Sequence, residues 1–113
     1  MEQPEVLPVD PAQVVVALAD DPTQEAVIRL VGEHDMSSVE ELAQAVSRVL
    51  DGGWSDLVVD LSRVEFMDSV VVNQLLIASK RLGMAGRTVR VRDPSPAARH
   101  VLELCGLTHL VEP

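Results

Sequence analysis

The feature that most constrains the fold is a short, mostly apolar run at residues 57–61, which lies between two segments with helical periodicity. Upstream, apolar residues recur at the spacing of one helical stripe: Leu42, Ala45, Val46, Val49 and Leu50. Downstream, residues 69–83 repeat that spacing with Val72, Leu75, Leu76, Ser79 and Leu82. A buried strand between two amphipathic helices predicts an α/β fold.

The remaining segments extend this pattern. Residues 13–19 and 26–31 have strand character, and the turn chemistry of residues 20–24 between them predicts an antiparallel hairpin. Residues 88–91 alternate as another strand, and residues 109–111 are expected to add a short one. The order β-β-α-β-α-β-α predicts a mixed sheet of four to five strands, because strands joined through a helix pair in parallel by right-handed crossovers. The helices are expected mainly on one face.

Length and composition fit a single domain. Residues 1–11 are punctuated by prolines and are expected to form a flexible lead-in, and residues 12–113 are expected to form one domain. Trp54 and Phe66 are the only aromatic residues of the chain, so the core must consist of Val, Leu, Ile and Ala. Such a core suits a small sheet covered by helices.

Local signals predict where helices begin. Ser37 or Ser38 is expected to cap the first helix, with an acidic residue three positions later completing a capping box. Ser95 and Pro96 predict the N-cap and first position of the last helix. Cys105 follows apolar residues at the inner positions of that helix and is expected to be a buried thiol. As the only cysteine, it cannot form an internal disulfide.

Charge and hydropathy narrow the classes of function. The chain carries 18 acidic and 9 basic side chains, a formal charge of −9, and this acidic excess opposes binding to nucleic acid. No apolar run approaches the roughly 20 residues that span a bilayer. The first ten residues lack the basic and then apolar pattern of a signal peptide. The sequence therefore predicts a cytoplasmic protein without membrane insertion.

The segment VEFMDS at residues 64–69 places one hydroxyl, Ser69, at a helix start beside the carboxylate of Asp68. Helix starts present free backbone N–H groups and a partial positive charge, which favour a capping oxygen or an anion. Two interpretations are open for Ser69. It is a plain N-cap, or it is a switch that a phosphate group operates.

Four segments in this order resemble the STAS domain family, and within it the bacterial anti-sigma factor antagonists. They are GEHD at residues 32–35, VVDLS at 58–62, VEFMDS at 64–69 and LELCGL at 102–107. The resemblance extends from about Val14 to the C-terminus and implies the STAS fold, an α/β sheet with helices mainly on one face. It also implies a regulatory binding protein, which needs no cofactor and is not an enzyme.

The resemblance implies a role for Ser69. In such antagonists the serine after the aspartate is phosphorylated by an anti-sigma factor that is itself a protein kinase. The unphosphorylated antagonist binds this kinase and releases a sigma factor, and a phosphatase of the PP2C type resets the phosphorylated form. One departure concerns the residues after this serine. The family usually continues with Ser or Thr and then Gly, whereas this chain has Val70 and Val71.

Further candidate residues surround Ser69. Asp68 is a structural cap or a positioning carboxylate for kinase-bound Mg²⁺, and Asp35 is a solvated loop acid or a second functional acid at the same sheet end. Val70 and Ile77 lie outside the expected core stripe, and with Ser69 and Asn73 they are expected to form a partner-binding face. The alternative is that neighbouring loops bury Val70 and Ile77.

Two other functions compete with the antagonist hypothesis. One is a STAS subunit held permanently in a larger signalling scaffold or transporter complex, which the missing family glycine favours. The other is a hydrolase that uses Ser69, His34 and Asp35, but the sequence lacks a nucleophile elbow and a glycine-rich oxyanion loop. The histidines at positions 34, 100 and 109 lack the spacing of a zinc site, so no metal is expected.

Overall fold

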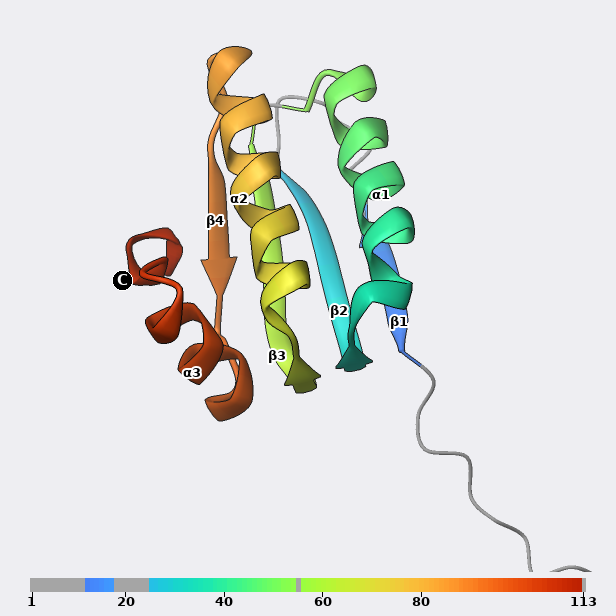
Figure 1. Ribbon diagram of the computed structural model, residues 1–113. Helices are drawn as coiled ribbons and strands as arrows, with labels where there is room; N and C mark the ends of the chain where they lie inside the picture. Colours follow the sequence, from blue (N-terminus) through green and yellow to red (C-terminus); the bar gives the residue numbers. More distant parts are fainter. Residues whose placement is uncertain (1–11, 18–24, 55, 113) are drawn as a thin grey trace, which may run out of the picture.

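The computed structural model describes residues 12–17, 25–54 and 56–112 (Figure 1). The lead-in at residues 1–11 and the turn at residues 20–24 lie outside this part of the chain.

The centre of the sheet consists of β2 (Ala26–His34) and β3 (Leu57–Met67), which run parallel. On one side β1 (Gln13–Ala17) pairs antiparallel with β2, and on the other β4 (Val89–Arg92) pairs parallel with β3. The strand order is β1-β2-β3-β4. This confirms the mixed sheet and the hairpin-like start. The expected strand at 109–111 is wrong, because these residues form a 3-10 turn and a single bridge to β4.

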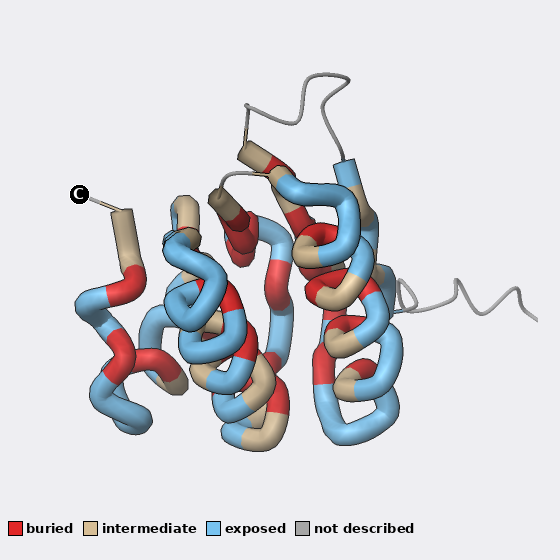
Figure 2. The backbone as a smooth tube through the Cα atoms, turned by 90° about the horizontal axis from the view of Figure 1, so that it is seen from above, coloured by how far each residue is buried: buried red, intermediate tan, exposed pale blue. Residues whose placement is uncertain are grey.

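Three α-helices accompany the described part of the sheet: α1 (Val39–Gly52), α2 (Ser69–Met84) and α3 (Pro96–Leu104). In Figure 1, α1 and α2 lie across the front of the sheet and α3 lies beside β4. Figure 2 shows that the buried positions of the helices face the strands. Short 3-10 turns precede α1 (η1, Met36–Ser38) and follow α3 (η2, Thr108–Leu110). No described helix is long and apolar enough to cross a bilayer.

The core lies between the helices and the sheet. On α1 the expected stripe is buried, with Leu50 only partly covered. On α2 the expected stripe is partly wrong, since Leu76 and Ser79 are only half-buried. The buried residues of α2 are instead Val71, Val72, Leu75, Ala78 and Leu82. These residues still form one stripe at helical spacing, but the stripe is turned from the expected one, and α2 contacts both α1 and α3.

β3 runs well past the apolar run at its start. Its pairing with β2 shifts register at two points, and at each point β3 carries one extra residue. Its buried residues therefore recur at every third position in its second half: Leu61, Val64 and Met67. Opposite the second bulge, Gly32 has φ 88°, which a side-chain-bearing residue adopts at a cost. The bulges keep Arg63 and Glu65 in solvent while Met67 reaches the core.

At α3 the expected start is confirmed, and the expected burial of Cys105 is wrong. Ser95 Oγ accepts a hydrogen bond from the Ala98 amide at 3.1 Å, and Pro96 is the first helical residue. The helix ends at Leu104, so Cys105 lies one residue beyond it and is exposed rather than buried.

Candidate functional site

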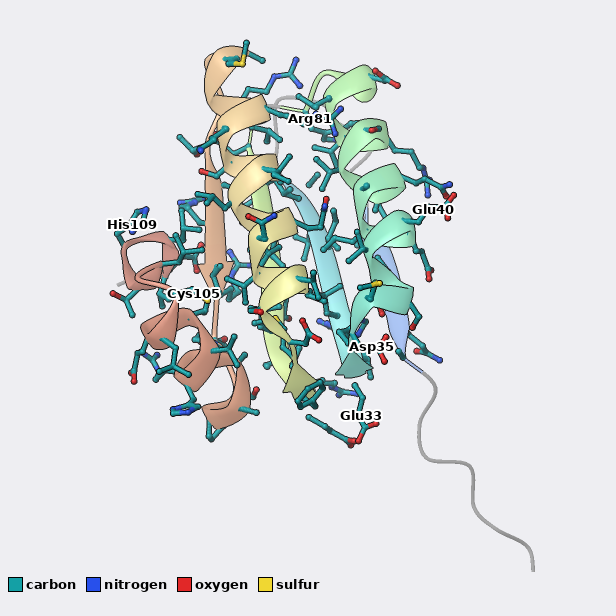
Figure 3. All side chains as sticks on the ribbon, viewed as in Figure 1. Glu33, Asp35, Glu40, Arg81, Cys105 and His109 are labelled. Atoms are coloured by element: carbon teal, nitrogen blue, oxygen red, sulfur yellow. The ribbon has the colours of Figure 1, made fainter. Side chains whose placement is uncertain are left out.

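The carboxyl ends of β2 and β3 meet at one edge of the sheet, because the two strands are parallel neighbours. Each strand is followed by an aspartate that begins a helical segment, Asp35 after β2 and Asp68 after β3. The two starts are joined directly, since the Asp68 amide donates to the His34 carbonyl at 3.1 Å. Figure 3 shows Asp35 beside the tip of β2. The structure thus brings the two predicted acids to the same edge.

Asp68, not Ser69, is the N-cap of α2. Its Oδ1 accepts from the Val70 amide at 2.7 Å, and its carbonyl accepts from the Val71 and Val72 amides at 3.1 and 3.3 Å. Its backbone is extended, with φ −91° and ψ 161°, as an N-cap requires. The interpretation of Ser69 as a plain N-cap is therefore wrong. Ser69 is the first residue of the helix proper.

Ser69 is exposed, and within the described residues its hydroxyl makes no hydrogen bond. Other serines at helix starts differ in this respect. Ser37 Oγ donates to Asp35, Ser38 Oγ bonds to the His34 ring, and Ser95 Oγ caps α3. The Ser69 hydroxyl therefore contributes no bond to the described part of the fold, and it is exposed at the positive end of a helix of 16 residues.

Asp35 is exposed and caps the short η1 turn. Its Oδ1 accepts from the Ser37 hydroxyl at 2.6 Å and from the Ser37 amide at 2.8 Å. These two bonds, the hydroxyl one first, lower the pKa of Asp35 below its ordinary value of 3.8. Asp35 is thus a charged local cap, with its second oxygen left for solvent or a partner.

His34 has a structural role that the sequence analysis did not predict. It is fully buried, with Nε2 2.9 Å from the Val31 carbonyl and Nδ1 2.9 Å from Ser38 Oγ. A carbonyl only accepts, so Nε2 carries a proton, and in the neutral ring Nδ1 accepts from Ser38. Ser38 therefore makes no capping bond to α1, and the expected capping box is wrong. A signal existed, because His34 continues the inward alternation of β2 through Ile28 and Leu30.

The face predicted for partner binding is open on α2. Ser69, Asn73 and Ile77 follow one another at four-residue spacing and are exposed, with Ile77 39% accessible. Val70 beside them is half-buried. The alternative, in which loops bury both apolar residues, does not hold for Ile77. Within the described residues no group of His, Cys, Asp or Glu is arranged to hold a metal ion.

Comparison with known proteins decides the family. The family model described as "Mlab, STAS domain" matches residues 17–112. This chain belongs to the STAS domain family. An anti-sigma F factor antagonist of Lysinibacillus sphaericus is 36% identical over 83 residues, which cover 72% of this chain and 70% of that protein. The anti-sigma-F factor antagonist RsfB of Mycobacterium tuberculosis is 33% identical over 97 residues, covering 86% and 78%.

Solved STAS structures have the same fold. The anti-sigma factor antagonist SpoIIAA in its unphosphorylated form aligns with a TM-score of 0.78 at 26% identity, over 88% of this chain and 86% of that one. SpoIIAA from Bacillus has also been solved in a phosphorylated form, which aligns with a TM-score of 0.72 at 26% identity and covers 88% and 89%.

The departure of this STAS domain from the family pattern has a structural meaning. Val71, which stands where the family has glycine, is fully buried in the core. Its side chain therefore fills space beneath the helix start and not on the surface above Ser69. Val70, where the family has Ser or Thr, is half-buried and carries no hydroxyl. Ser69 is thus the single hydroxyl in the first turn of α2.

Two exposed apolar side chains at this edge of the STAS domain were missed by sequence analysis. Met36 in η1 is 71% accessible, and Phe66 near the end of β3 is 49% accessible. Phe66 pairs in register with Glu33, which Figure 3 shows at the lower tip of the domain near Asp35. The edge that carries Ser69 thus exposes apolar groups, which are typical of a surface that binds another protein, and carboxylates lie around them.

Proposed function

We propose that this STAS domain is an anti-sigma factor antagonist that binds an anti-sigma factor with protein kinase activity. Phosphorylation of Ser69 by that kinase releases the domain from it, and a phosphatase of the PP2C type removes the phosphate. Through this exchange the domain regulates transcription that depends on a sigma factor, and it is expected to act in the cytoplasm. The names of the relatives and the phosphorylated form of SpoIIAA support the proposal.

The observation that carries the proposal is the free, exposed hydroxyl of Ser69 at a helix start capped by its neighbour. A kinase that transfers the γ-phosphoryl group of ATP to this oxygen breaks no bond that holds the fold. The transfer forms the Oγ–P bond, and ADP leaves. The hydroxyl proton passes to a base of the kinase. The antagonist supplies the acceptor and needs no catalytic group of its own.

The same geometry gives the phosphate its effect. A phosphoserine carries about −1.5 to −2 charges at neutral pH. The Val70 amide already donates a hydrogen bond to Asp68 Oδ1 at 2.7 Å, so it is not available to bind the phosphate group. The phosphate group therefore remains turned outward. A partner packed over Ser69 then has to desolvate a dianion beside the Asp68 carboxylate, which opposes binding. The fold itself is expected to survive.

The partner surface proposed here contains Ser69, Val70, Asn73 and Ile77 on α2, with Asp68 and Asp35 at its rim. The acidic rim and the charge of −9 favour a partner whose binding site is edged with Lys or Arg. The competing function as a permanent subunit drew on the missing family glycine. The burial of Val71 removes that reason, because the added side chain lies beneath the surface.

The test compares three baits in native lysate: wild type, Ser69→Glu and Ser37→Glu. Ser37 is the matched control, since it is also an exposed serine next to an aspartate at a helix start of the same edge. We expect wild type and Ser37→Glu to retain an ATP-binding kinase-fold protein identified by mass spectrometry, and Ser69→Glu to lose it. The recovered kinase should then label wild type with phosphate from ATP. Equal capture by all three baits would contradict the switch.

The face on α2 is tested separately with Asn73→Arg/Ile77→Asp. Both side chains are exposed, so the double variant should keep the circular dichroism and melting temperature of wild type. We expect its affinity for the same kinase to fall at least tenfold, as for the loss of a central contact. Unchanged affinity in the folded variant would remove α2 from the interface but leave the phosphorylation proposal standing.

A further inference from the structure

The two edge strands of the sheet, β1 and β4, differ in how well they are protected from pairing with another strand. The β4 edge carries Arg90 and Arg92, which form ion pairs with Glu25 and Glu112, and its outer side takes part in a bridge to Val111. In the described part of the chain, β1 pairs with β2 alone, so its outer side has no partner. Its sequence QVVVA contains no charge and no proline. Proteins usually protect an exposed edge with such residues or with a bulge, because a bare edge pairs with another strand.

A hollow lies next to this bare edge. Its volume is about 220 Å³, and it lies between β1 and the outer side of α1. The lining consists of Val14, Val16, Glu41, Gln44, Ala45 and Arg48. The two valines and Ala45 supply an apolar lining, and the longer side chains of α1 stand around it.

The α1 residues of this hollow form one stripe along the helix. Glu41, Gln44 and Arg48 are all exposed and lie at three- and four-residue spacing. The acid is at the beginning of the stripe and the base at its end, roughly 10 Å apart by the helical rise. No ion pair joins either residue to another described residue. The stripe therefore presents opposite charges at its two ends.

We propose that two copies of this chain associate through their β1 strands, which pair antiparallel about a two-fold axis at Val15. This axis places Val14 of one copy opposite Val16 of the other and makes one continuous sheet. Because α1 and β1 line the same hollow, the axis also passes near Gln44 and Ala45. The two α1 helices then lie antiparallel along the dimer seam.

The charges of the α1 stripe fit this symmetry. In an antiparallel pair of helices, Glu41 of each copy faces Arg48 of the other, so the axis creates two equivalent ion pairs. Gln44, which is exposed and uncharged, lies at the centre of this seam and places no like charges opposite each other. A chain of net charge −9 repels its copies in general, so this local complementarity is what selects a second copy as the occupant.

The dimer leaves the Ser69 surface free. In Figure 1, α2 lies between α1 and α3, so the helix that begins with Ser69 is away from the β1 edge. Dimerisation through β1 is therefore independent of phosphorylation at Ser69, and a separate experiment tests each.

The test is a pair of charge reversals, Glu41→Arg and Arg48→Glu, followed by sedimentation equilibrium. Wild type is expected to show a dimer that dissociates on dilution. Each single variant places like charges opposite each other twice, so its dimerisation should weaken by about tenfold or more. An equimolar mixture of the two variants should dimerise as wild type does, because each acid then faces a base. The double variant Glu41→Arg/Arg48→Glu should also recover.

Glu103→Arg and Arg99→Glu on α3 are the matched controls, as both residues are exposed and the changes in net charge are identical. They should leave the dissociation constant unchanged. Val15→Lys tests the strand itself, since Val15 is 44% accessible and its copy faces it across the axis; this variant should be monomeric and folded. A wild type that remains monomeric at every concentration, or a dimer indifferent to the α1 reversals and to Val15→Lys, would overturn the proposal.

Discussion

The two helix starts at the Ser69 edge use the same residue types in different ways. After β2, Asp35 caps the turn and also binds the hydroxyl of Ser37 at 2.6 Å. After β3, Asp68 caps α2 through the Val70 amide at 2.7 Å, and the hydroxyl of Ser69 has no hydrogen bond to any other described residue. Both aspartates therefore stabilise a helical segment, but only the second start keeps its serine available.

A fold can thus carry a modifiable hydroxyl without depending on that hydroxyl for its stability. Where the serine itself bonds to the cap, adding a phosphate costs a bond of the native structure. Where the aspartate alone caps the helix, the serine is dispensable for stability and free to change its charge. The structural basis of the proposed switch is thus that Asp68 caps α2 while the hydroxyl of Ser69 is not needed as a cap.

The largest expected effect is that the kinase phosphorylates Ser69 and not Ser37. With the cognate kinase and ATP, Ser69→Ala should lose all phosphate incorporation, because α2 has no other hydroxyl in its first turn. Ser37→Ala should be labelled like wild type. Mass spectrometry of the intact chain measures both. Phosphate on Ser37 in wild type would break the comparison.

The next effect concerns His34, which holds the two starts together through its ring and its carbonyl. His34→Ala leaves the buried Ser38 hydroxyl and the Val31 carbonyl without partners and opens a cavity. We expect the free energy of unfolding to fall by roughly 2–4 kcal/mol. Urea denaturation measures it, with the exposed His100→Ala as a control that should stay within about 0.5 kcal/mol of wild type.

Removal of the caps should give a smaller, graded effect. Asp68→Ala removes the cap of a helix of 16 residues and should lower the free energy of unfolding by about 1 kcal/mol. Asp35→Ala removes the cap of a 3-10 turn of three residues and should cost less. Ser69→Ala should leave the denaturation midpoint unchanged. A loss for Ser69→Ala as large as for Asp68→Ala would show that the serine is structural after all.

The smallest expected effect is a change in the pKa of the Asp35 carboxyl group. The Ser37 hydroxyl and amide lower the pKa of Asp35 below 3.8, so this loop is stabilised above pH 3.8 and loses that stabilisation as pH falls through the lowered pKa. Ser37→Ala should raise the pKa of Asp35 toward 3.8, as followed by NMR of its carboxyl carbon. Ser69→Ala should leave the Asp35 titration where it is in wild type.

Much of the fold was predictable, because periodicity reports which side of an element faces the core. The stripe of α1, the order of elements along the chain up to α3 and the start of α3 all follow from local spacing and caps. The errors arise where several elements meet. α2 contacts both neighbouring helices, and its buried stripe is turned so that it includes Val71 and Ala78 in place of Leu76 and Ser79. Cys105 was expected inside because its helix was expected to continue past Leu104, where it ends.

The sequence predicted that Asp68 and Ser69 lie at a helix start on this edge of the sheet, but it did not predict their hydrogen bonds. The motif located Asp68 and Ser69. Which of the two is the N-cap depends on whether the helix begins one residue earlier or later, and only the backbone geometry decides this. The role of His34 depends on Ser38 and on a carbonyl, and the contact across to α2 joins residues far apart in sequence. No local pattern specifies such contacts.

The two bulges of β3 have a consequence for how this domain tolerates change. Together they add two residues to β3. Side chains along a strand alternate between the two faces every two residues, so Met67 still points to the core face. A substitution between Ser62 and Phe66 leaves that count intact, whereas the loss or gain of one residue there would turn Asp68 and Ser69 to the opposite side. The number of residues in this stretch, more than their identity, determines the direction in which Ser69 points.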